Sequence, residues 1–550
     1  MWKGRRKLFR RSLSSSGPSP AVTLLLIGLG ALAILANGCA VVGPDFIKPS
    51  APESQEWIEK DDPKILSEPA NFSNWWTLFN DPVLNTLIEM ASQQNLPLQI
   101  AGIRILEARA QLGIATGNLY PQLQQARGGY TYTEVSENAA NTLAADVEFG
   151  EVDIGFDAAW ELDMWGKFRR AVESGVADLD ATIANYDDVL VTLTADVART
   201  YVRICTLEER LAIARENVRI QERSFQIASV RFKGGDVTEL DVQQAKALLR
   251  DTQALIPRLE ASLRQAKNGL AILLGVLPSE IEGILGEAGL IPAAPAEVAV
   301  GIPAELLRRR PDIRFAERKI AAQSSLIGVA KADLYPHFSL FGSIGLRSSD
   351  AKFTKDGGAS GSDLGDLFDS DSLEFFAGPS FNWDVLNYGR IKNRVRVQDA
   401  RFQQLAVNYQ NTVLRASQEV EDAMVAFLRS QDEVGLLTES VQAAKRSVDL
   451  SQVQYREGLV DYQRVLDTER FLSQQEDLLA DTSGAVAINL IAIYKALGGG
   501  WQIRTGKDFV PEETMDEMKT RTDWGDLLSR ERLETQPPER VRKQWRSPDW

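Results

Sequence analysis

Residues 98–121 read LQIAGIRILEARAQLGIATGNLYP, and residues 313–336 read IRFAERKIAAQSSLIGVAKADLYP. A shift of 215 positions superimposes the two stretches. Alanine, isoleucine and glycine recur at matching positions, and both stretches close on the run Leu-Tyr-Pro. A duplication of this length predicts one architecture that is built from two similar halves.

The duplication continues downstream of the Leu-Tyr-Pro runs. A shift of 223 positions pairs Trp160 with Trp383 and Gly166 with Gly389. We therefore expect a first structural repeat at residues 96–290 and a second at residues 291–502. Each repeat should contain a helix, a β-hairpin and a long helical hairpin. Any mechanism must therefore be consistent with this internal symmetry.

A heptad pattern follows the first of these tryptophans. Apolar residues recur every seven positions at Ile183, Leu190, Val197, Ile204, Leu211, Val218, Phe225 and Phe232. A softer line lies three positions later, at Tyr186, Leu193, Thr200, Leu207, Ala214, Gln221 and Ala228. A sustained a/d pattern of this kind is typical of a coiled coil. No proline interrupts residues 168–232, which predicts a helix of roughly 65 residues and roughly 100 Å.

The second repeat carries the same seam. Its apolar positions are Ala406, Val413, Val420, Phe427, Val434, Val441, Val448 and Tyr455. A rod-like periplasmic coiled coil without a pore would show such heptads too, so that alternative stays open here.

Glycine-containing turns end both long helices. The first turn is Lys233-Gly234-Gly235-Asp236, and the second includes Gly458. Glycine supplies the left-handed backbone that stops a helix. Return helices are expected over residues 238–274 and 462–497, so each repeat should form a helical hairpin with an exposed tip.

Alternating patterns predict four strands. They lie near residues 123–132, 152–160, 338–345 and 373–383. The polar stretches between paired strands, 134–150 and 348–372, are interpreted as exposed loops, the second of them mobile. Membranes tolerate only helices and closed barrels, and transmembrane barrels need at least about eight strands. Strands of this length also occur in soluble sheets; if they do span a membrane, copies of the chain must share one barrel.

The N-terminal residues 1–38 are interpreted as a lipoprotein signal peptide. A basic start precedes an apolar run of 16 residues at 21–36, which is short for a membrane-spanning helix. The run ends at a lipobox-like stretch that closes on Cys39. We expect Cys39 to be acylated and residues 39–95 to form a lipid-anchored segment; a plain secretory signal is the alternative.

Composition argues against enzymes and nucleic-acid binding proteins. The formal charge is −15, and removal of the six basic residues in the signal segment would leave roughly −21. The chain has one histidine, His337, and two cysteines, of which Cys205 would remain as a buried hydrophobic residue. We see no catalytic triad, phosphate-binding loop or metal-ligand spacing, and we expect no cofactor, no metal site and no enzymatic activity.

Five motifs resemble those of one family. They are residues 39–46 (CAVVGPDF), 75–84 (WWTLFNDPVL), 161–167 (ELDMWGK), 306–314 (LLRRRPDIR) and 494–501 (YKALGGGW). Together they resemble the TolC-like outer membrane efflux proteins, specifically the lipoprotein branch that serves tripartite multidrug pumps. The similarity runs from about residue 39 to residue 502.

This resemblance implies a mainly α fold with a small β part. Three copies would share a 12-stranded transmembrane β-barrel, with four strands from each chain, and their long helical hairpins would continue it as a periplasmic α-barrel. The implied function is the exit duct of a tripartite efflux system in the outer membrane of a Gram-negative bacterium. The implied partners are two further copies, outer-membrane lipid, a periplasmic adaptor and an inner-membrane transporter. The exit duct of a one-step protein secretion system is an alternative within the fold.

The resemblance also implies a periplasmic gate on the second return helix. The family's aspartate ring falls on Asp467, where three carboxylates would hold a hydrated, cation-favouring constriction. Arg470 lies one helical turn away and could pair across chains. Related proteins often carry an acidic or bulky residue where this chain has Gln463 and Arg464, and Arg464 would relax the constriction. Asp241, near the matching height of the first repeat, is interpreted as a surface charge.

Two further expectations concern the ends of the helical hairpins and the C-terminus. The tips at Gly234, Gly235 and Gly458 are candidate docking points for the adaptor, although turn chemistry alone would explain these glycines. Residues 503–550 are a charged tail that lies outside the resemblance. We expect the tail to wrap the waist of the trimer or to stay disordered.

Overall fold

The computed structural model describes residues 41–528 except 53, 55, 67–71, 137, 139–145, 287–288, 304–308, 356–357 and 362. The signal segment and Cys39 therefore lie outside the described residues. The chain divides into two compact units. Unit 1 contains residues 118–171 and 326–395 with the short segment that ends at Pro44, and unit 2 contains the rest.

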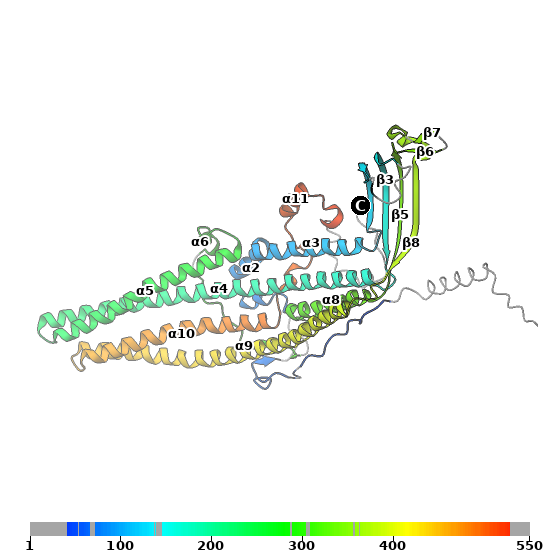
Figure 1. The fold of residues 1–550 in the computed structure, drawn as a ribbon. Helices are drawn as coiled ribbons and strands as arrows, with labels where there is room; N and C mark the ends of the chain where they lie inside the picture. The colour runs from blue at the N-terminus through cyan, green and yellow to red at the C-terminus, as the bar shows by residue number, and fades with distance from the viewer. Residues whose placement is uncertain are drawn as a thin grey trace, which may run out of the picture. The chain divides into compact units, whose positions relative to one another are not determined.

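Four long helices dominate unit 2. They are α4 (Lys167–Gly234), α5 (Glu239–Leu274), α9 (Arg390–Arg456) and α10 (Tyr462–Ala496). Figure 1 shows α5 folding back along α4 and α10 folding back along α9. The helix α4 has 68 residues, which corresponds to roughly 100 Å. The predicted helical hairpins are confirmed.

The heptad positions form the contacts between these helices. Along α4 every seam position from Ile183 to Val218 is buried. The polar Gln221 on the second line is 2% exposed, whereas Phe232 at the tip is 43% exposed. In α9 the seam is buried except at Val434, which is half-buried. The heptad pattern thus predicted the buried faces of both helices. The prediction of burial fails at Phe232, which lies at the exposed end of α4.

The duplicated stretches that precede the strands are also helices. They are α3 (Leu96–Gly117) and α8 (Pro311–Ala332), each of 22 residues. Both end just before their Leu-Tyr-Pro run, because proline cannot continue a helix and restricts the residue before it. Shorter helices are α2 (Pro82–Gln94), α6 (Ile281–Leu285), η1 (Trp75–Phe79), η3 (Leu364–Phe368) and η4 (Ser370–Ser372).

Unit 1 is built on one antiparallel sheet. Its strands are β2 (Leu123–Glu134), β3 (Glu148–Leu162), β5 (His337–Ser349) and β8 (Leu373–Asn382), in the order β2-β3-β5-β8. The four predicted strands are confirmed, and they lie side by side in Figure 1. Because β2 and β8 each pair on one side only, the sheet has two open edges.

The second inter-strand stretch differs from its prediction as a plain loop. It contains a short hairpin, β6 (Lys352–Lys355) with β7 (Gly358–Gly361), and the two turns of η3 and η4. Asp363 explains one of these elements, because Asp363 and Asp366 form a reciprocal capping box at the start of η3. In unit 2, β1 (Ile65–Leu66) pairs in parallel with β4 (Val298–Ala299).

The charged tail begins at residue 503, and its described part, up to residue 528, is folded together with residues 501–502. The alternative of a disordered tail is therefore wrong for this part, and wrapping of the waist of a trimer stays a prediction. Residues 501–528 form η5 (Trp501–Arg504), α11 (Glu512–Arg521) and η6 (Gly525–Leu528). Phe509 packs edge-on against Tyr186 of α4 at 5.1 Å between ring centroids. The Phe509 carbonyl also approaches Gly102 so closely that a Cβ there would lie 2.0 Å from it. The last residues, 529–550, lie outside the described part.

Two further features of unit 2 concern single elements. Cys205 is buried in α4, as predicted, and burial raises the pKa of its thiol to about 12. Within the described residues one helix, α10, is long and apolar enough to cross a membrane by length and composition. Its apolar window is 44% buried inside the fold, and core helices of soluble proteins pass the same test.

Candidate functional site: a two-faced sheet, its junctions and the hairpin tips

One face of the β-sheet exposes a continuous row of apolar side chains. Phe156 of β3 lies opposite Ile344 of β5, and Ile344 lies opposite Phe375 of β8. Directly opposed residues of an antiparallel pair share a face. The three side chains are 51%, 51% and 69% exposed. This face offers aromatic and aliphatic surface to its surroundings, as a lipid-facing sheet does.

The opposite face of the sheet carries a charge cluster. Arg127 of β2 donates hydrogen bonds to Asp153 at 2.8 Å and to Asp157 at 3.2 Å, both on β3. The Arg127 guanidinium also reaches Ser343 on β5 at 3.4 Å. One charged residue therefore ties three strands together on this face, which fits a polar lumen rather than an apolar core.

Each β-hairpin is tied to the helix end that precedes it. The indole Nε1 of Trp160 donates to the carbonyl of Leu119 at 3.1 Å. In the second repeat, Trp383 donates to the carbonyl of Leu334, also at 3.1 Å. The two bonds relate residues that the sequence shifts of 223 and 215 had paired, so the duplication persists in individual hydrogen bonds.

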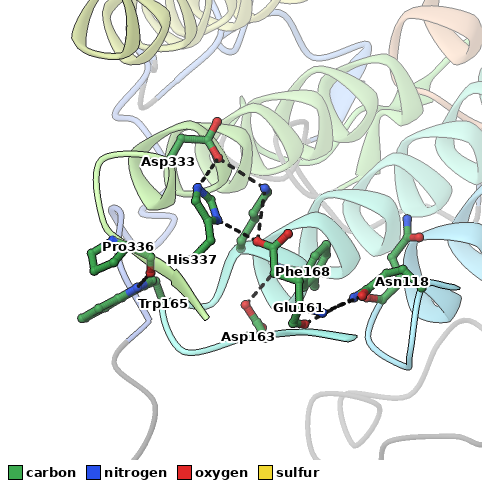
Figure 2. Close-up of polar contacts among 10 residues, drawn as sticks. Asn118, Glu161, Asp163, Trp165, Phe168, Asp333, Pro336 and His337 are labelled. Carbon is green, nitrogen blue, oxygen red and sulfur yellow. Dashed lines mark hydrogen bonds and ion pairs between the residues drawn. The ribbon is translucent and has the colours of Figure 1, made fainter. Parts of the chain in front are cut away.

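A polar cluster lies where β3 and β5 leave the sheet. The single histidine, His337, contacts Glu161 through Nδ1 at 2.7 Å and Asp333 through Nε2 at 3.9 Å. Lys167 bridges the same two carboxylates at 3.5 and 3.3 Å. Figure 2 shows the His337 ring between Asp333 and Glu161. The cluster joins the end of the β-hairpin of the first repeat to the start of the β-hairpin of the second repeat.

The start of α4 is fixed by two neighbours of this cluster. Asp163 accepts hydrogen bonds from the backbone N–H groups of Phe168 and Arg169, at 3.1 and 3.0 Å, and so caps the helix. Trp165 donates to the Pro336 carbonyl at 2.8 Å, and its ring stacks on Tyr335 at 4.7 Å. Figure 2 shows Trp165 lying against Pro336. The motif ELDMWGK thus forms an ordered junction between β3 and α4.

In unit 2, a buried carboxylate joins three segments of the chain. Asp187 of α4 is fully buried and binds the guanidinium groups of Arg314 and Arg504. The second bond from Arg504 measures 3.2 Å. Both guanidinium groups lie over the ring of Trp501, at 4.8 and 5.4 Å. The arrangement fastens α8 and the C-terminal segment to α4.

The two hairpin tips contact each other. Gly235 and Gly458 have φ values of +84° and +75°, so both occupy the left-handed region that glycine tolerates. Arg231, in the last turn of α4, donates to the carbonyl of Tyr455 and lies 4.7 Å over its ring. Tyr455 in turn packs edge-on against Tyr462 at 5.3 Å. Gly234 is the exposed last residue of α4.

The expected gate residues lie on the exposed side of α10 near this tip. Asp467 is exposed and accepts a hydrogen bond from Gln463 at 2.9 Å. The side chains of Arg464 and Arg470 are exposed as well, and within the described chain neither forms an ion pair with Asp467. Asp241, at the start of α5, accepts from Thr238 at 3.3 Å. Asp467 is thus open to solvent in the single chain.

One buried acid in this region was not predicted. Glu469 is 2% exposed and accepts hydrogen bonds from Ser224 of α4 and from Gln452 of α9, the latter at 2.9 Å. Its second carboxylate oxygen has no partner in the described chain, and burial raises the pKa of Glu469. The i, i+3, i+4 spacing of Tyr462, Val465 and Leu466 could have placed Glu469 on the buried face.

The contact between Arg231 and Tyr455 had no signal in the sequence, because the two residues lie on different hairpins. The described residues contain no group of three or more His, Cys, Asp and Glu side chains that could hold a metal ion. The described geometry offers a two-faced sheet and long helical hairpins.

The family model described as outer membrane efflux protein matches residues 87–276 and 302–499. Nodulation protein T of Rhizobium leguminosarum bv. viciae is 30% identical, covering 86% of this chain and 92% of its own. The probable outer membrane lipoprotein SilC of Salmonella typhimurium is 30% identical, covering 87% and 99%. The solved outer-membrane channel OprN is 32% identical, with a TM-score of 0.76, covering 84% and 99%.

Proposed function

Because this chain belongs to the outer membrane efflux protein family, we propose that it is the outer-membrane exit duct of a tripartite efflux system. In this role it conducts substrates passively from an inner-membrane transporter and a periplasmic adaptor across the periplasm and the outer membrane. The observation that carries the proposal is the sheet with one apolar face and one charged face, in the same chain as helices of roughly 100 Å.

Closure of the sheet requires further copies of the chain, and three is the number that the family resemblance implies. A sheet edge in lipid would leave backbone N–H and C=O groups without partners, at a cost of several kcal/mol for each group. The edges at β2 and β8 therefore need partners from other chains. Three copies supply twelve strands in a closed barrel, with the apolar row outside and the Arg127 cluster inside.

A gate at the periplasmic end is part of the proposal. Asp467 is exposed near a hairpin tip, and copies of it around an axis would form a ring of carboxylates. Like charges that converge repel one another and attract cations. Arg470 lies on the next turn and is available to bind the carboxylate of a neighbouring copy, while Arg464 adds positive charge beside the ring.

Two further roles are proposed, one for Cys39 and one for the turns at the tips of the helical hairpins. We propose that Cys39 carries the lipid anchor in the outer membrane, in line with the relative SilC, which is described as a probable outer membrane lipoprotein. The turns at Gly234, Gly235 and Gly458 are proposed as adaptor-docking points. They are exposed, and their helices meet through Arg231 and Tyr455. No enzymatic step is proposed.

The duct is tested by solute release. Purified protein is reconstituted into liposomes that contain a small hydrophilic dye, without nucleotide and without an ion gradient. Wild type and Asp467→Ala are compared with protein-free liposomes. We expect passive release, faster for the variant. Folded trimers that release no dye in either form would contradict the duct and favour the coiled coil without a pore.

A further inference from the structure

The two strand-to-helix junctions have the same sequence pattern but different surroundings. Residues 160–167 read WELDMWGK, and residues 383–390 read WDVLNYGR. The shift of 223 pairs Trp165 with Tyr388. Trp165 is half-buried, whereas Tyr388 is 98% exposed. The first junction is therefore covered, and the second is bare.

The cover of the first junction comes from the second repeat. Trp165 stacks on Tyr335 at 4.7 Å and donates to the Pro336 carbonyl at 2.8 Å. Both partners belong to the Leu-Tyr-Pro run that leads into β5, the strand that pairs with β3. A junction is thus covered by the Tyr-Pro pair of the neighbouring strand in the sheet.

The same rule assigns a cover to Tyr388. Tyr335 and Pro336 correspond to Tyr120 and Pro121, which lead into β2. Within one chain β2 and β8 stand at opposite edges of the four-stranded sheet. Three strand spacings of about 4.8 Å separate the two edges, so the chain's own Tyr120 is out of reach of Tyr388. The matching cover must come from a second copy.

The residues around Tyr388 fit burial against protein. Val385 and Leu386 are 65% and 84% exposed. Leu386 replaces Asp163, which caps α4 in the first repeat, so a charged residue of the covered junction has an apolar counterpart here. Exposed apolar side chains of this size are costly in water and mark interaction surfaces.

The backbone at Tyr388 gives a second indication. Its φ of +49° lies in the left-handed region, which aromatic residues disfavour. Asn80 and Tyr388 are the non-glycine residues of the described chain with positive φ. Tyr388 holds this backbone without the stacking partner that its counterpart Trp165 has.

We propose that the junction at residues 383–389 is completed by a second copy of this chain, with Tyr388 packing on Tyr120 and Pro121 of the partner subunit. The proposal rests on the trimeric duct and names the residues that join its subunits at the base of the sheet. The polar cluster of the first junction is half repeated there, because Glu161 and Lys167 correspond to Asp384 and Arg390, whereas Asp333 and His337 correspond to Asn118 and Gln122. The contact of Tyr388 itself is aromatic and apolar.

Cross-linking in the outer membrane tests this pairing. Cysteines replace Tyr388 and Tyr120 in the full chain with Cys205→Ser, Cys39 being retained for its lipid, and membranes are treated with a bifunctional maleimide. We expect covalent dimers and trimers on denaturing gels. The matched control, Trp165→Cys with Tyr335→Cys, should link within one chain and stay at monomer mass. Each single variant should give no ladder.

The outcomes separate this inference from the proposed function. Trimers seen by native mass spectrometry without any ladder would overturn the pairing and leave the duct intact. Absence of trimers would overturn both. A second readout does not depend on cysteines: Tyr388→Ala should raise the fraction of trimer that dissociates on mild heating several-fold, and Tyr388→Phe should not. Equal dissociation of both variants and wild type would also contradict the pairing.

Discussion

The indole Nε1 of Trp383 donates a hydrogen bond of 3.1 Å to the backbone carbonyl of Leu334. Trp160 makes the same bond, at the same length, with Leu119. In each repeat the bond joins the end of the second strand to the helix end before the first strand. Each β-hairpin is thereby closed at its base by its own repeat, while the two repeats meet along the pairing of β3 with β5 and at the first junction.

Replacing these tryptophans tests that closure. Trp160→Phe and Trp383→Phe each remove the indole donor and keep an aromatic ring. We expect a loss of about 1 kcal/mol in folding free energy for each, as for a typical hydrogen bond. The melting temperature of the purified protein measures the loss. Unchanged melting temperatures of both variants would contradict the closure of the hairpins by these bonds.

Asp163 should stabilise the start of α4 through its cap. Asp163→Ala removes two backbone hydrogen bonds and the contact with Arg169 at 2.9 Å, and we expect a loss of about 1–2 kcal/mol. Asp163→Asn keeps a capping oxygen and should lose less. Glu209→Ala, at an exposed position of α4 that caps nothing, serves as the control. Thermal unfolding followed by far-UV circular dichroism distinguishes these variants, and equal losses for all three would contradict the capping role.

Asp187 should be the most sensitive of these positions. Asp187→Ala leaves Arg314 and Arg504 without their shared buried carboxylate, and breaking a buried pair in this way costs about 3–5 kcal/mol. Protease digestion should then cut the C-terminal segment around residues 505–511 faster than in wild type. Asp196→Ala, which removes a partly exposed acid of the same helix, is the control. An unchanged rate of digestion of Asp187→Ala would show that the ion pairs of Asp187 do not hold the C-terminal segment on α4.

The buried carboxyl group of Glu469 should make the folding stability depend on pH. Burial raises its folded-state pKa above the ordinary value of 4.5, so folding favours the protonated form. Its contribution is fully present below pH 4.5 and is lost as the pH rises through the folded-state pKa. Glu469→Gln keeps the shape without the charge, and it should be more stable than wild type at pH 8, by about 1–3 kcal/mol, and nearly equal at pH 4.

The control for this pH dependence is Glu439→Gln, at an exposed glutamate of α9. It should follow the wild-type melting temperature across the same pH range. If Glu469→Gln were less stable than wild type at pH 8, the buried carboxylate would be a net stabilising group and the predicted sign would be wrong.

Much of the fold could be predicted from the chain alone because its periods are long and regular. The seam from Ile183 to Val218 repeats every seven residues, and the structure buries each of these positions. The residues after Pro336 alternate, and they form β5. Periodic patterns of this length report burial directly, because one side of every turn or pleat must meet a neighbour.

The missed features depend on contacts between distant segments. Asp187 meets Arg504 across 317 positions, and Arg231 meets Tyr455 across 224. Nothing local marks either pair. The charge of the segment around Phe509 left two alternatives open, wrapping of the waist or disorder, and the Phe509 ring packs on Tyr186 of α4, which excludes disorder there. Gate and docking roles for Asp467 and the tip glycines remain predictions, since one chain shows their exposure but not their partners.

The central claim is a water-filled duct that is narrowed by Asp467, and single-channel recording in planar bilayers tests it most directly. Wild type is recorded beside Asp467→Ala and beside Asp241→Ala, the matched aspartate of the first repeat. The account predicts small, cation-selective currents for wild type and for Asp241→Ala, and clearly larger, less selective currents for Asp467→Ala. Folded trimers that give no channels in any of the three forms would contradict it.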